Sequence, residues 1–414
     1  MDFNLGEITL AALVLAVTLS CFTRLNIGVL AIGAAWLIGV YVGGMPARDI
    51  SAGFPVDLFL TLTGVSLLFS LAQVNGTLEK VAHEAVRFCR GRVGFVPILY
   101  FFLGAVLASA GPGNIATTGL LAPIAMSAAL RMNISPFLMA IMVGNGANSG
   151  SLSPLAPTGI IVGGLMTRIQ LPGMELRTWF YNFIAHAIVA FGGYLLFGGW
   201  KLLRRTDRLD VAIETAKPME RPQVITLGVI LLLLVGVIAA GLHIGFAAFT
   251  GAVLLILLGA ADQDEAIKKI PWGSILMVCG MTVLISLLEK TSGMQIFTNL
   301  LTSVATRTTI IPFLAMIIGL ISAYSSTSGV VLPAFLPLVP GLTANLGGGI
   351  AASIASTMNV AGHLVDVSPL STIGALCLAS VPAGKASRRL FNQLLAWGLS
   401  MTVAGAVICW FLFA

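Results

Sequence analysis

The sequence predicts an all-α integral membrane protein built from two inverted repeats, and three observations support this fold class. First, 57% of the 414 residues are hydrophobic and only 9% are charged, a composition that excludes an ordinary soluble globular domain. Second, apolar stretches long enough to cross a bilayer recur along the chain. Third, a Ser-Pro-Leu motif followed by a glycine begins at Ser153 and again at Ser368, about 215 residues later.

About ten membrane crossings are expected from the hydropathy of the chain. Eight stretches are continuous enough for one span each, and they cover 8–23, 26–43, 56–74, 178–202, 224–241, 244–260, 272–289 and 390–413. Two more stretches, 134–167 and 347–381, are too long and too interrupted for one regular helix. We therefore predict that each of these two is a broken span.

Two further apolar segments, 94–130 and 308–344, carry small or polar residues at their centres. The first centre is Gly111-Pro112-Gly113-Asn114, and the second is Ser325-Ser326-Thr327-Ser328. Each segment is predicted to be a re-entrant hairpin that enters and leaves the membrane on the same side. Irregular backbone survives at bilayer depth only where protein or a water-filled cavity satisfies its polar groups, so these segments point to a functional interior.

The positions of lysine and arginine predict how the chain is oriented. If the N-terminus lies outside, seventeen of the 22 basic residues fall in cytoplasmic segments, and the five outside are Arg48, Arg168, Arg177, Lys290 and Arg307. This bias follows the positive-inside rule only if both hairpins return to their side of entry. We therefore expect a multi-pass protein of a bacterial-type inner membrane, with both termini outside. The scattered basic residues form no continuous face, so nucleic acid is not an expected partner.

Weak similarities outside the Ser-Pro-Leu motif extend the repeat. Phe54-Pro55 opens one predicted span and Ile270-Pro271 opens another, while Ser109 and Ser322 precede the two hairpin tips. Five crossings per half make the second half enter from the side opposite the first, so the repeat is inverted. Paired interruptions in the two halves of such a repeat are the best sequence indication of a transporter binding site.

Each broken span is predicted to present a helix N-terminus near the middle of the membrane. Asparagines 145 and 148 precede Ser153-Pro154, and residues 359–366 precede Ser368-Pro369 in the same way. Serine followed by proline is typical of an N-cap and first helical position. Two half-helix N-termini with free N–H groups, lined by amides and hydroxyls, suit a small anion, and a carboxylate fits best.

The polar residues of the broken spans also have structural interpretations. Asn145 and Asn148 are candidates for hydrogen bonds between helices, and Asp366 is as well placed for a helix cap as for a functional site. A bare carboxylate at position 366 would repel an anion, so we expect it to be protonated in part of the cycle or close to a coupling cation, with His363 as its proton partner. His186 and His243 are expected to be packed or interfacial.

The predicted arrangement of hairpins and broken spans resembles that of a known transporter superfamily. A hairpin and a broken span in each half, with polar tips, are similar to the ion-transporter superfamily, which includes the divalent-anion/sodium symporters. The run from Gly144 to Gly159, GNGANSGSLSPLAPTG, is similar to bacterial malonate-type dicarboxylate carriers. The symporters typically carry Ser-Asn-Thr at both tips, whereas this chain has Asn114 at the first tip and Thr327, without an asparagine, at the second.

The resemblance implies a division of labour along the chain. Residues 1–92 and 223–307 would form the scaffold, residues 93–203 and 308–414 the moving transport parts, and 204–222 the cytoplasmic linker. It also implies an elevator motion and a homodimer. The substrate would be bound by hydroxyls and amides at the tips and broken spans, namely Asn114, Thr117, Thr118, Ser326, Thr327, Ser328, Ser153 and Ser368. The coupling ion would be handled by Asn145, Asn148, Asn359, His363 and Asp366, with sodium near Asn114, Asn145, Thr327 and Asp366.

The expected function is secondary active transport of a small organic dianion of the malonate or succinate type, coupled to Na⁺ or H⁺ and without another cofactor. Driving a dianion into an inside-negative cell costs about 4.6 kcal/mol per 100 mV, because each charge costs about 2.3 kcal/mol. Cotransported cations would cancel that cost. The alternative within the same superfamily is cation/proton antiport. An enzyme is not expected, because the sequence shows no metal motif and no nucleophile with a base.

Overall fold

The computed structural model describes residues 4–23, 25–88, 93–204, 218–382 and 384–414. All regular elements in these ranges are helices, so the predicted all-α fold is confirmed. Seven of the described helices are long and apolar enough to cross a membrane, and several shorter apolar helices accompany them. Most of the predicted cytoplasmic linker, residues 205–217, lies outside the described ranges.

The described residues of the first half form eleven α-helices and two π-helical segments. They are α1 (Leu5–Phe22), α2 (Ile27–Trp36), η1 (Leu37–Val42), α3 (Ala47–Ser51), α4 (Val56–Val74), α5 (Thr77–Phe88), α6 (Phe95–Ala110), α7 (Gly113–Arg131), α8 (Pro136–Gly150), α9 (Pro157–Arg168), α10 (Glu175–Tyr194), η2 (Leu195–Gly199) and α11 (Trp200–Leu203). The predicted span 56–74 coincides with α4, and the predicted hairpin 94–130 is the pair α6 and α7.

The second half repeats this order. Its elements are α12 (Arg221–Ala240), α13 (Ile244–Leu257), α14 (Gln263–Lys269), α15 (Trp272–Lys290), α16 (Gly293–Val304), α17 (Ile310–Ser322), η3 (Thr327–Val331), α18 (Leu332–Phe335), η4 (Leu336–Leu338), α19 (Val339–Asn345), α20 (Ala351–Leu364), α21 (Thr372–Ala379) and α22 (Lys385–Phe413). The second predicted hairpin therefore consists of α17 and a return arm, η3 to α19, that proline residues divide into short helical pieces.

Two symmetrical helix contacts show how the repeated halves fit together. Helix α4 packs against α13 of the other half, and α15 packs in the same way against α2. A Cβ atom on Gly280 would overlap the carbonyl of Gly28, and one on Gly64 would crowd the carbonyl of Gly245. Small residues at such crossings allow backbones to approach closely in membrane proteins. Each half therefore contributes one helix to each of the two crossings.

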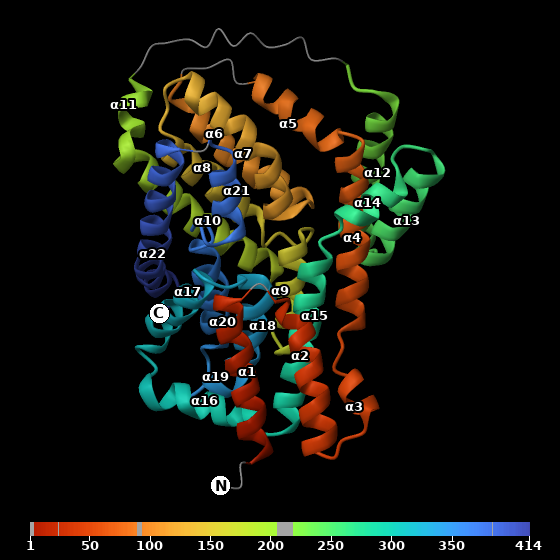
Figure 1. The fold of residues 1–414 in the computed structure, drawn as a ribbon, viewed down its shortest axis with the longest axis vertical. Helices are drawn as coiled ribbons and strands as arrows, with labels where there is room; N and C mark the ends of the chain where they lie inside the picture. The colour runs from red at the N-terminus through yellow and green to blue at the C-terminus, as the bar shows by residue number, and fades with distance from the viewer. Residues whose placement is uncertain (1–3, 24, 89–92, 205–217, 383) are drawn as a thin grey trace.

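The contacts between loops separate the two predicted sides of the membrane. Lys290 Nζ donates to the carbonyl of Asp49 at 2.7 Å, which joins two segments predicted to lie outside. At the other side, Asn75 Nδ2 donates to the carbonyl of Ala260 at 3.1 Å, joining two segments predicted to be cytoplasmic. In Figure 1, α3 and α16 lie at the end nearest the N-terminus, and α5 and α11 lie at the opposite end. Which end faces the cytoplasm stays a prediction.

The glycines before the first break have a packing role. Helix α8 runs regularly through Gly144 and Asn145 to Gly150, and it packs closely against α6. A Cβ atom on Gly146 would overlap the carbonyl of Phe101 in α6. The break predicted within 134–167 therefore begins only after Gly150, and the glycine-rich run remains helical while it lets α6 approach.

Candidate functional site

Both broken spans exist, but their second half-helices start later than the sequence predicts. Helix α9 begins at Pro157 with Ala156 as its N-cap, and α21 begins at Thr372 with Ser371 as its N-cap. The prediction that Ser153 and Ser368 are N-caps is therefore wrong. A second proline, Pro157, occupies the favoured first helical position, so the Ser153-Pro154 pair is left in the turn between the half-helices.

The two motif serines instead stabilise these turns. Ser153 Oγ donates to the carbonyl of Ser109 at 2.7 Å, which ties the first break to the first hairpin. Ser368 Oγ accepts from the backbone N–H of Leu370 at 3.4 Å. Ser371 Oγ donates to the carbonyls of Ser368 and Asp366, so it closes the second turn.

The first hairpin tip contacts the first broken span through Asn114. Gly111 and Gly113 have φ values of 141° and 75°, a region that favours glycine, and they turn the chain from α6 into α7. Asn114 then lies in the first turn of α7, 8% exposed, and its Nδ2 donates to Asn148 Oδ1 at 2.8 Å. The first tip is thus closed against α8 by an amide–amide hydrogen bond.

The second tip contacts the second broken span through Thr327. The Thr327 hydroxyl lies 2.8 Å from Asp366 Oδ1 and 3.1 Å from the carbonyl of Gly362, so its single hydrogen is shared between two acceptors. Asp366 therefore directs its carboxylate across to the hairpin, and the cap of α21 is Ser371. The alternative interpretation of Asp366 as a helix cap is wrong.

The two tips occupy equivalent positions of the repeat. Asn114 and Thr327 are 327 − 114 = 213 residues apart, and Ser109 and Ser322 are 322 − 109 = 213 residues apart. The broken spans also meet at equivalent positions, because Asn148 Nδ2 donates to the carbonyl of His363 at 3.4 Å, 215 residues further along. The structure therefore brings Asn114, Asn148, His363, Thr327 and Asp366 together around the centre of the repeat.

The other predicted substrate residues differ in their surroundings. Thr117 and Thr118 are buried in α7, and their hydroxyl oxygens have no hydrogen-bond partner among the described residues. Ser326 is exposed and accepts from the N–H of Gly329 at 3.1 Å, while Ser328 is half-buried. Ser325 turns away from the broken spans and shares a 2.6 Å hydrogen bond with Ser20 of α1.

Two predicted coupling-ion residues direct their side chains away from the tips. Asn145 Oδ1 lies 2.9 Å from His186 Nδ1, and Asn145 Nδ2 donates to the carbonyl of Ile141. Asn359 Nδ2 lies 3.9 Å from Met166 Sδ. These two residues lie on the faces of α8 and α20 that meet other helices.

Two residues of α10 that were not predicted as site residues also lie in this region. His186, expected only to be packed or interfacial, bonds to Asn145, and Asn182 Nδ2 donates to the carbonyl of Asn148 at 2.7 Å. Both side chains are fully buried. Their spacing of four residues, which places two polar side chains on one face of a membrane helix, is the sequence signal that could have revealed them.

The electrostatic character of the site comes mainly from one carboxylate. The segments 93–130, 132–167 and 308–384 contain no lysine or arginine, and Asp366 is their only acidic residue. Arg168, at the end of α9, forms a 2.5 Å ion pair with Glu289 of α15. Fixed positive charge is thus absent from both hairpins and both broken spans, so an anion there would depend on helix N-termini, neutral donors and mobile cations.

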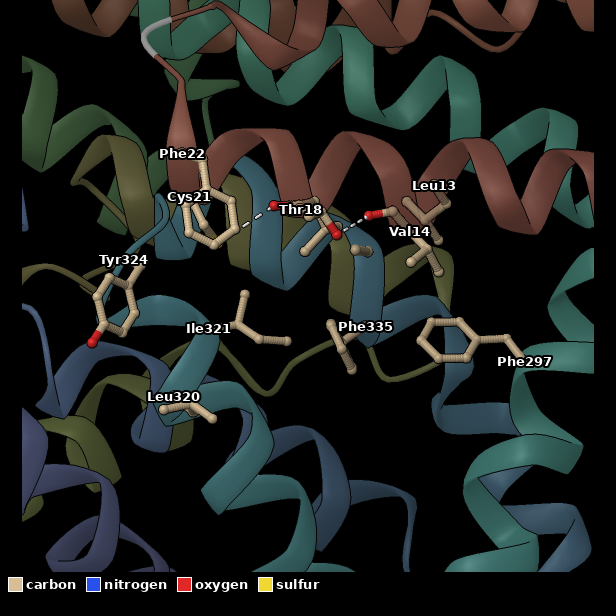
Figure 2. A pocket seen from close by; sticks show the side chains of 12 residues that line it. Leu13, Val14, Thr18, Cys21, Phe22, Phe297, Leu320, Ile321, Tyr324 and Phe335 are labelled. Carbon is tan, nitrogen blue, oxygen red and sulfur yellow. Dashed lines mark hydrogen bonds between the residues drawn. The ribbon is translucent and has the colours of Figure 1, made fainter.

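A separate cavity of about 600 Å³ lies between α1 and the second hairpin, and Figure 2 shows its lining. Its walls are mostly apolar and include Phe22, Phe297 and Phe335. Thr18 and Cys21 donate to carbonyls of their own helix, at 2.7 and 3.5 Å, so they offer no free hydrogen to a ligand. The cavity therefore does not suit a dianion, and the polar centre of the repeat is the better candidate site.

Comparisons with known proteins show similarity to a carrier family and to transporters. Residues 1–151 match the family described as the N-terminus of the dicarboxylate carrier protein MatC. Uncharacterized transporters of Mycobacterium bovis and Mycobacterium tuberculosis are 26% identical over 312 residues, covering 72% of this chain and 70% of each relative. The crystal structure of the Alcanivorax borkumensis YdaH transporter, described as having an unusual topology, shares the fold with a TM-score of 0.59 and 15% identity over 99% of this chain and 98% of that one.

The match over residues 1–151 confirms the predicted resemblance to dicarboxylate carriers. The chain is a multi-pass membrane protein, and its similarity to transporters supports a role in transport.

Proposed function

We propose that this transporter carries small dicarboxylates of three or four carbons, coupled to Na⁺ or H⁺. The observation that carries the proposal is the convergence of both hairpin tips on the two broken spans, through Asn114 with Asn148 and Thr327 with Asp366. Two equivalent tips, each offering a hydrogen-bond donor, suit a ligand with two equivalent anionic ends. We assign one substrate carboxylate to each tip.

Substrate binding would exchange hydrogen bonds at the tips. The single hydrogen of the Thr327 hydroxyl is already used by Asp366 and Gly362, so a substrate carboxylate must replace these acceptors. The amide nitrogen of Asn114, in contrast, has one hydrogen on Asn148 and a second one to offer. At the second tip the replaced group is itself a carboxylate. Two carboxylates at one hydroxyl repel each other unless a proton or a cation lies between them. Binding of the dianion and of the coupling cation at Asp366 would therefore favour each other.

The same proposal extends to the motion and assembly of the protein. Segments 93–203 and 308–414 would slide as an elevator against 1–92 and 223–307, in a homodimer. The polar contacts between these parts include the Arg168–Glu289 ion pair, the Ser20–Ser325 hydrogen bond, and the hydrogen bonds from Asn345 to Asn299 and from Arg307 to the carbonyl of Leu346. These contacts must break for the transport parts to move, and each is a single polar contact of modest strength.

Uptake into proteoliposomes tests the function directly. We expect purified protein to accumulate labelled malonate or succinate when a sodium or proton gradient is imposed, because cotransported cations cancel the charge of the dianion. Monocarboxylates of similar size serve as the control and should not be accumulated. The antiport alternative is favoured by the isolated acidic residue Asp366; it predicts Na⁺/H⁺ exchange without organic anion, and that result with no dicarboxylate uptake would contradict the proposal.

The positions of the basic residues predict which side of the membrane each loop faces. Cysteines introduced next to Arg204 should react with a membrane-impermeant thiol reagent only from the cytoplasm, and cysteines next to Arg168 or Arg307 only from outside, because basic residues concentrate in cytoplasmic loops. Labelling is measured in intact cells and in inverted vesicles, in a variant without the native cysteines. Labelling next to Arg204 in intact cells would reverse the orientation.

A further inference from the structure

The apolar cavity beside α1 is shared by two parts of the chain that are proposed to slide past each other. One wall is α1, completed by Phe297 of α16, and both helices belong to the scaffold. The opposite wall is the second hairpin, from Leu320 and Ile321 of α17 to Phe335 of α18. Figure 2 shows side chains of both walls around the same space. Whatever fills this cavity therefore contacts the scaffold and a transport part at once.

The walls offer a ligand hydrocarbon contacts rather than hydrogen bonds. Of the described residues that line the cavity, none is charged. The hydrogens of Thr18 and Cys21 are already donated to carbonyls of α1. In Figure 2 the hydroxyl of Tyr324 points away from the other labelled side chains. An apolar ligand is therefore favoured over water, because a buried water needs two or more polar partners.

The cavity opens towards the outer surface of α1. This helix is long and apolar enough to cross a membrane, and only 22% of its span is buried inside the protein. Val14 and Leu320 line the cavity from opposite walls, and both side chains are about half exposed. The uncovered apolar surface of a membrane span faces lipid tails, which are as apolar as its own side chains. The opening is thus continuous with this lipid-facing surface, and a lipid tail can enter from the side.

The shape of the cavity suits a chain-like ligand. Its lining on α1 runs from Leu13 to Phe22, which covers about 14 Å at about 1.5 Å per residue. Its volume of about 600 Å³ is typical of a site for a small organic molecule. A long, unbranched hydrocarbon can follow such an elongated apolar wall along its whole length.

We propose that this cavity binds a hydrocarbon tail of a bilayer lipid, which wedges between the scaffold and the second hairpin and slows their relative motion. The binding site stands on its own geometry, whereas the effect on motion rests on the proposed function. Because both walls contact the tail, it binds best when they keep their present arrangement. A ligand shifts a conformational equilibrium by its difference in affinity between the states. An occupied cavity therefore favours the present state and opposes the sliding step.

The cavity ends beside the contact that joins α1 to the second tip. Ser20 and Ser325 share a 2.6 Å hydrogen bond, and the residues next to them, Cys21 and Tyr324, both line the cavity. Thr327, which is assigned to a substrate carboxylate, follows Ser325 by two residues. A tail in the cavity thus restrains the hairpin that carries the second tip and leaves the polar site free. The rate of transport should depend on the tail, while dicarboxylate affinity should not.

Photo-crosslinking in nanodiscs tests the occupant. The discs contain phosphatidylethanolamine and phosphatidylglycerol, and a fraction of the lipid carries a diazirine on its tail. We expect adducts on Ala334 and Phe335, which are 0% and 4% exposed and which a tail reaches only through the cavity. Val17→Trp fills part of the cavity and should lower these adducts several-fold. Leu15→Trp, on the same helix but outside the lining, should leave them unchanged.

Adducts confined to exposed side chains overturn the site, whether the cavity then stays closed or is covered by a second copy of the chain. Adducts on the buried wall that Val17→Trp does not reduce overturn it as well, because the tail would then reach these residues by another route.

The thiol of Cys21 supplies a second measurement with the cavity wall unaltered. In a variant that keeps Cys21 and replaces the other four cysteines, an alkyl methanethiosulfonate should react faster than a charged trimethylammonium reagent of the same class. Succinate exchange in proteoliposomes should then slow several-fold with a hexadecyl reagent and recover when dithiothreitol reduces the new disulfide. A methyl reagent controls for modification without a tail. Faster reaction with the charged reagent would show a wet cavity and overturn the site.

These measurements separate a failure of the lipid site from a failure of the proposed transport. Unchanged exchange in fully modified protein overturns the effect of the tail on motion. Lipid adducts on Ala334 and Phe335 in a protein that carries no dicarboxylate would support the lipid site and refute only the proposed function.

Discussion

Alanine at position 114 or 327 is expected to weaken dicarboxylate binding by about 1.5–3 kcal/mol, a loss of roughly 10- to 150-fold in affinity, because each change removes one hydrogen bond to a charged group. Asn114 and Thr327 present the donors of the two equivalent tips. Isothermal titration of the purified variants with malonate and succinate measures the effect.

Two further variants separate a direct contact from a general disturbance of the tips. Thr327→Ser keeps the hydroxyl and should bind within a few-fold of the unchanged protein. Ser303→Ala removes an exposed hydroxyl that bonds only to its own helix, and it should have no effect on affinity. If both alanine variants bind the dicarboxylates normally, the tips do not hold the substrate, and the assignment of one carboxylate to each tip is wrong.

The sequence predicts the crossings well because the bilayer imposes a simple requirement. A chain that spans it must satisfy every backbone polar group internally, so spans appear as long apolar runs. The predicted spans 56–74 and 272–289 agree with α4 and α15 to within one residue. The hairpins were predictable for two reasons. Their centres are polar within apolar segments, and lysine and arginine concentrate on one side of the membrane only if each hairpin returns to its side of entry.

The start of each second half-helix was predicted wrongly because local signals compete. Ser153-Pro154 and Ala156-Pro157 each place a proline in a favourable first position, and only the packed structure selects Pro157. In the second half, Ser371 is preferred to Ser368 as the N-cap. Turn chemistry alone cannot distinguish two starts three residues apart, because both positions carry residues that suit an N-terminus.

The repeat made part of the candidate site predictable, and tertiary packing determined the rest. The equal spacing of Ser109 from Ser322 and of Asn114 from Thr327 makes the two tips equivalent on the sequence alone. The partners of Asn145 and Asn148 depend instead on the packing of α10 against α8, which no local pattern specifies. His186 was therefore not recognised, even though it lies one helical turn from Asn182 in a span that is otherwise largely apolar.

Replacing Asp366 by asparagine is expected to separate substrate binding from ion coupling. Asparagine keeps an acceptor for the hydroxyl of Thr327 but removes the titratable charge. The turn after α20 should survive, because Ser371 closes it through the backbone carbonyl of Asp366 rather than through the carboxylate. Dicarboxylate affinity should therefore stay within a few-fold of the unchanged protein, or improve as the repulsion between carboxylates disappears.

The loss should appear in accumulation against a gradient. Without its charge, position 366 no longer attracts the cation that offsets the dianion, and about 4.6 kcal/mol per 100 mV then opposes uptake into an inside-negative vesicle. We expect Asp366→Asn to exchange internal for external dicarboxylate at a normal rate, while net uptake no longer responds to the imposed cation gradient. Counterflow and gradient-driven uptake in the same proteoliposomes measure the two activities. If the variant instead accumulates substrate with unchanged ion dependence, Asp366 only holds the second hairpin closed, and the coupling cation must bind among the uncharged oxygens of the tips.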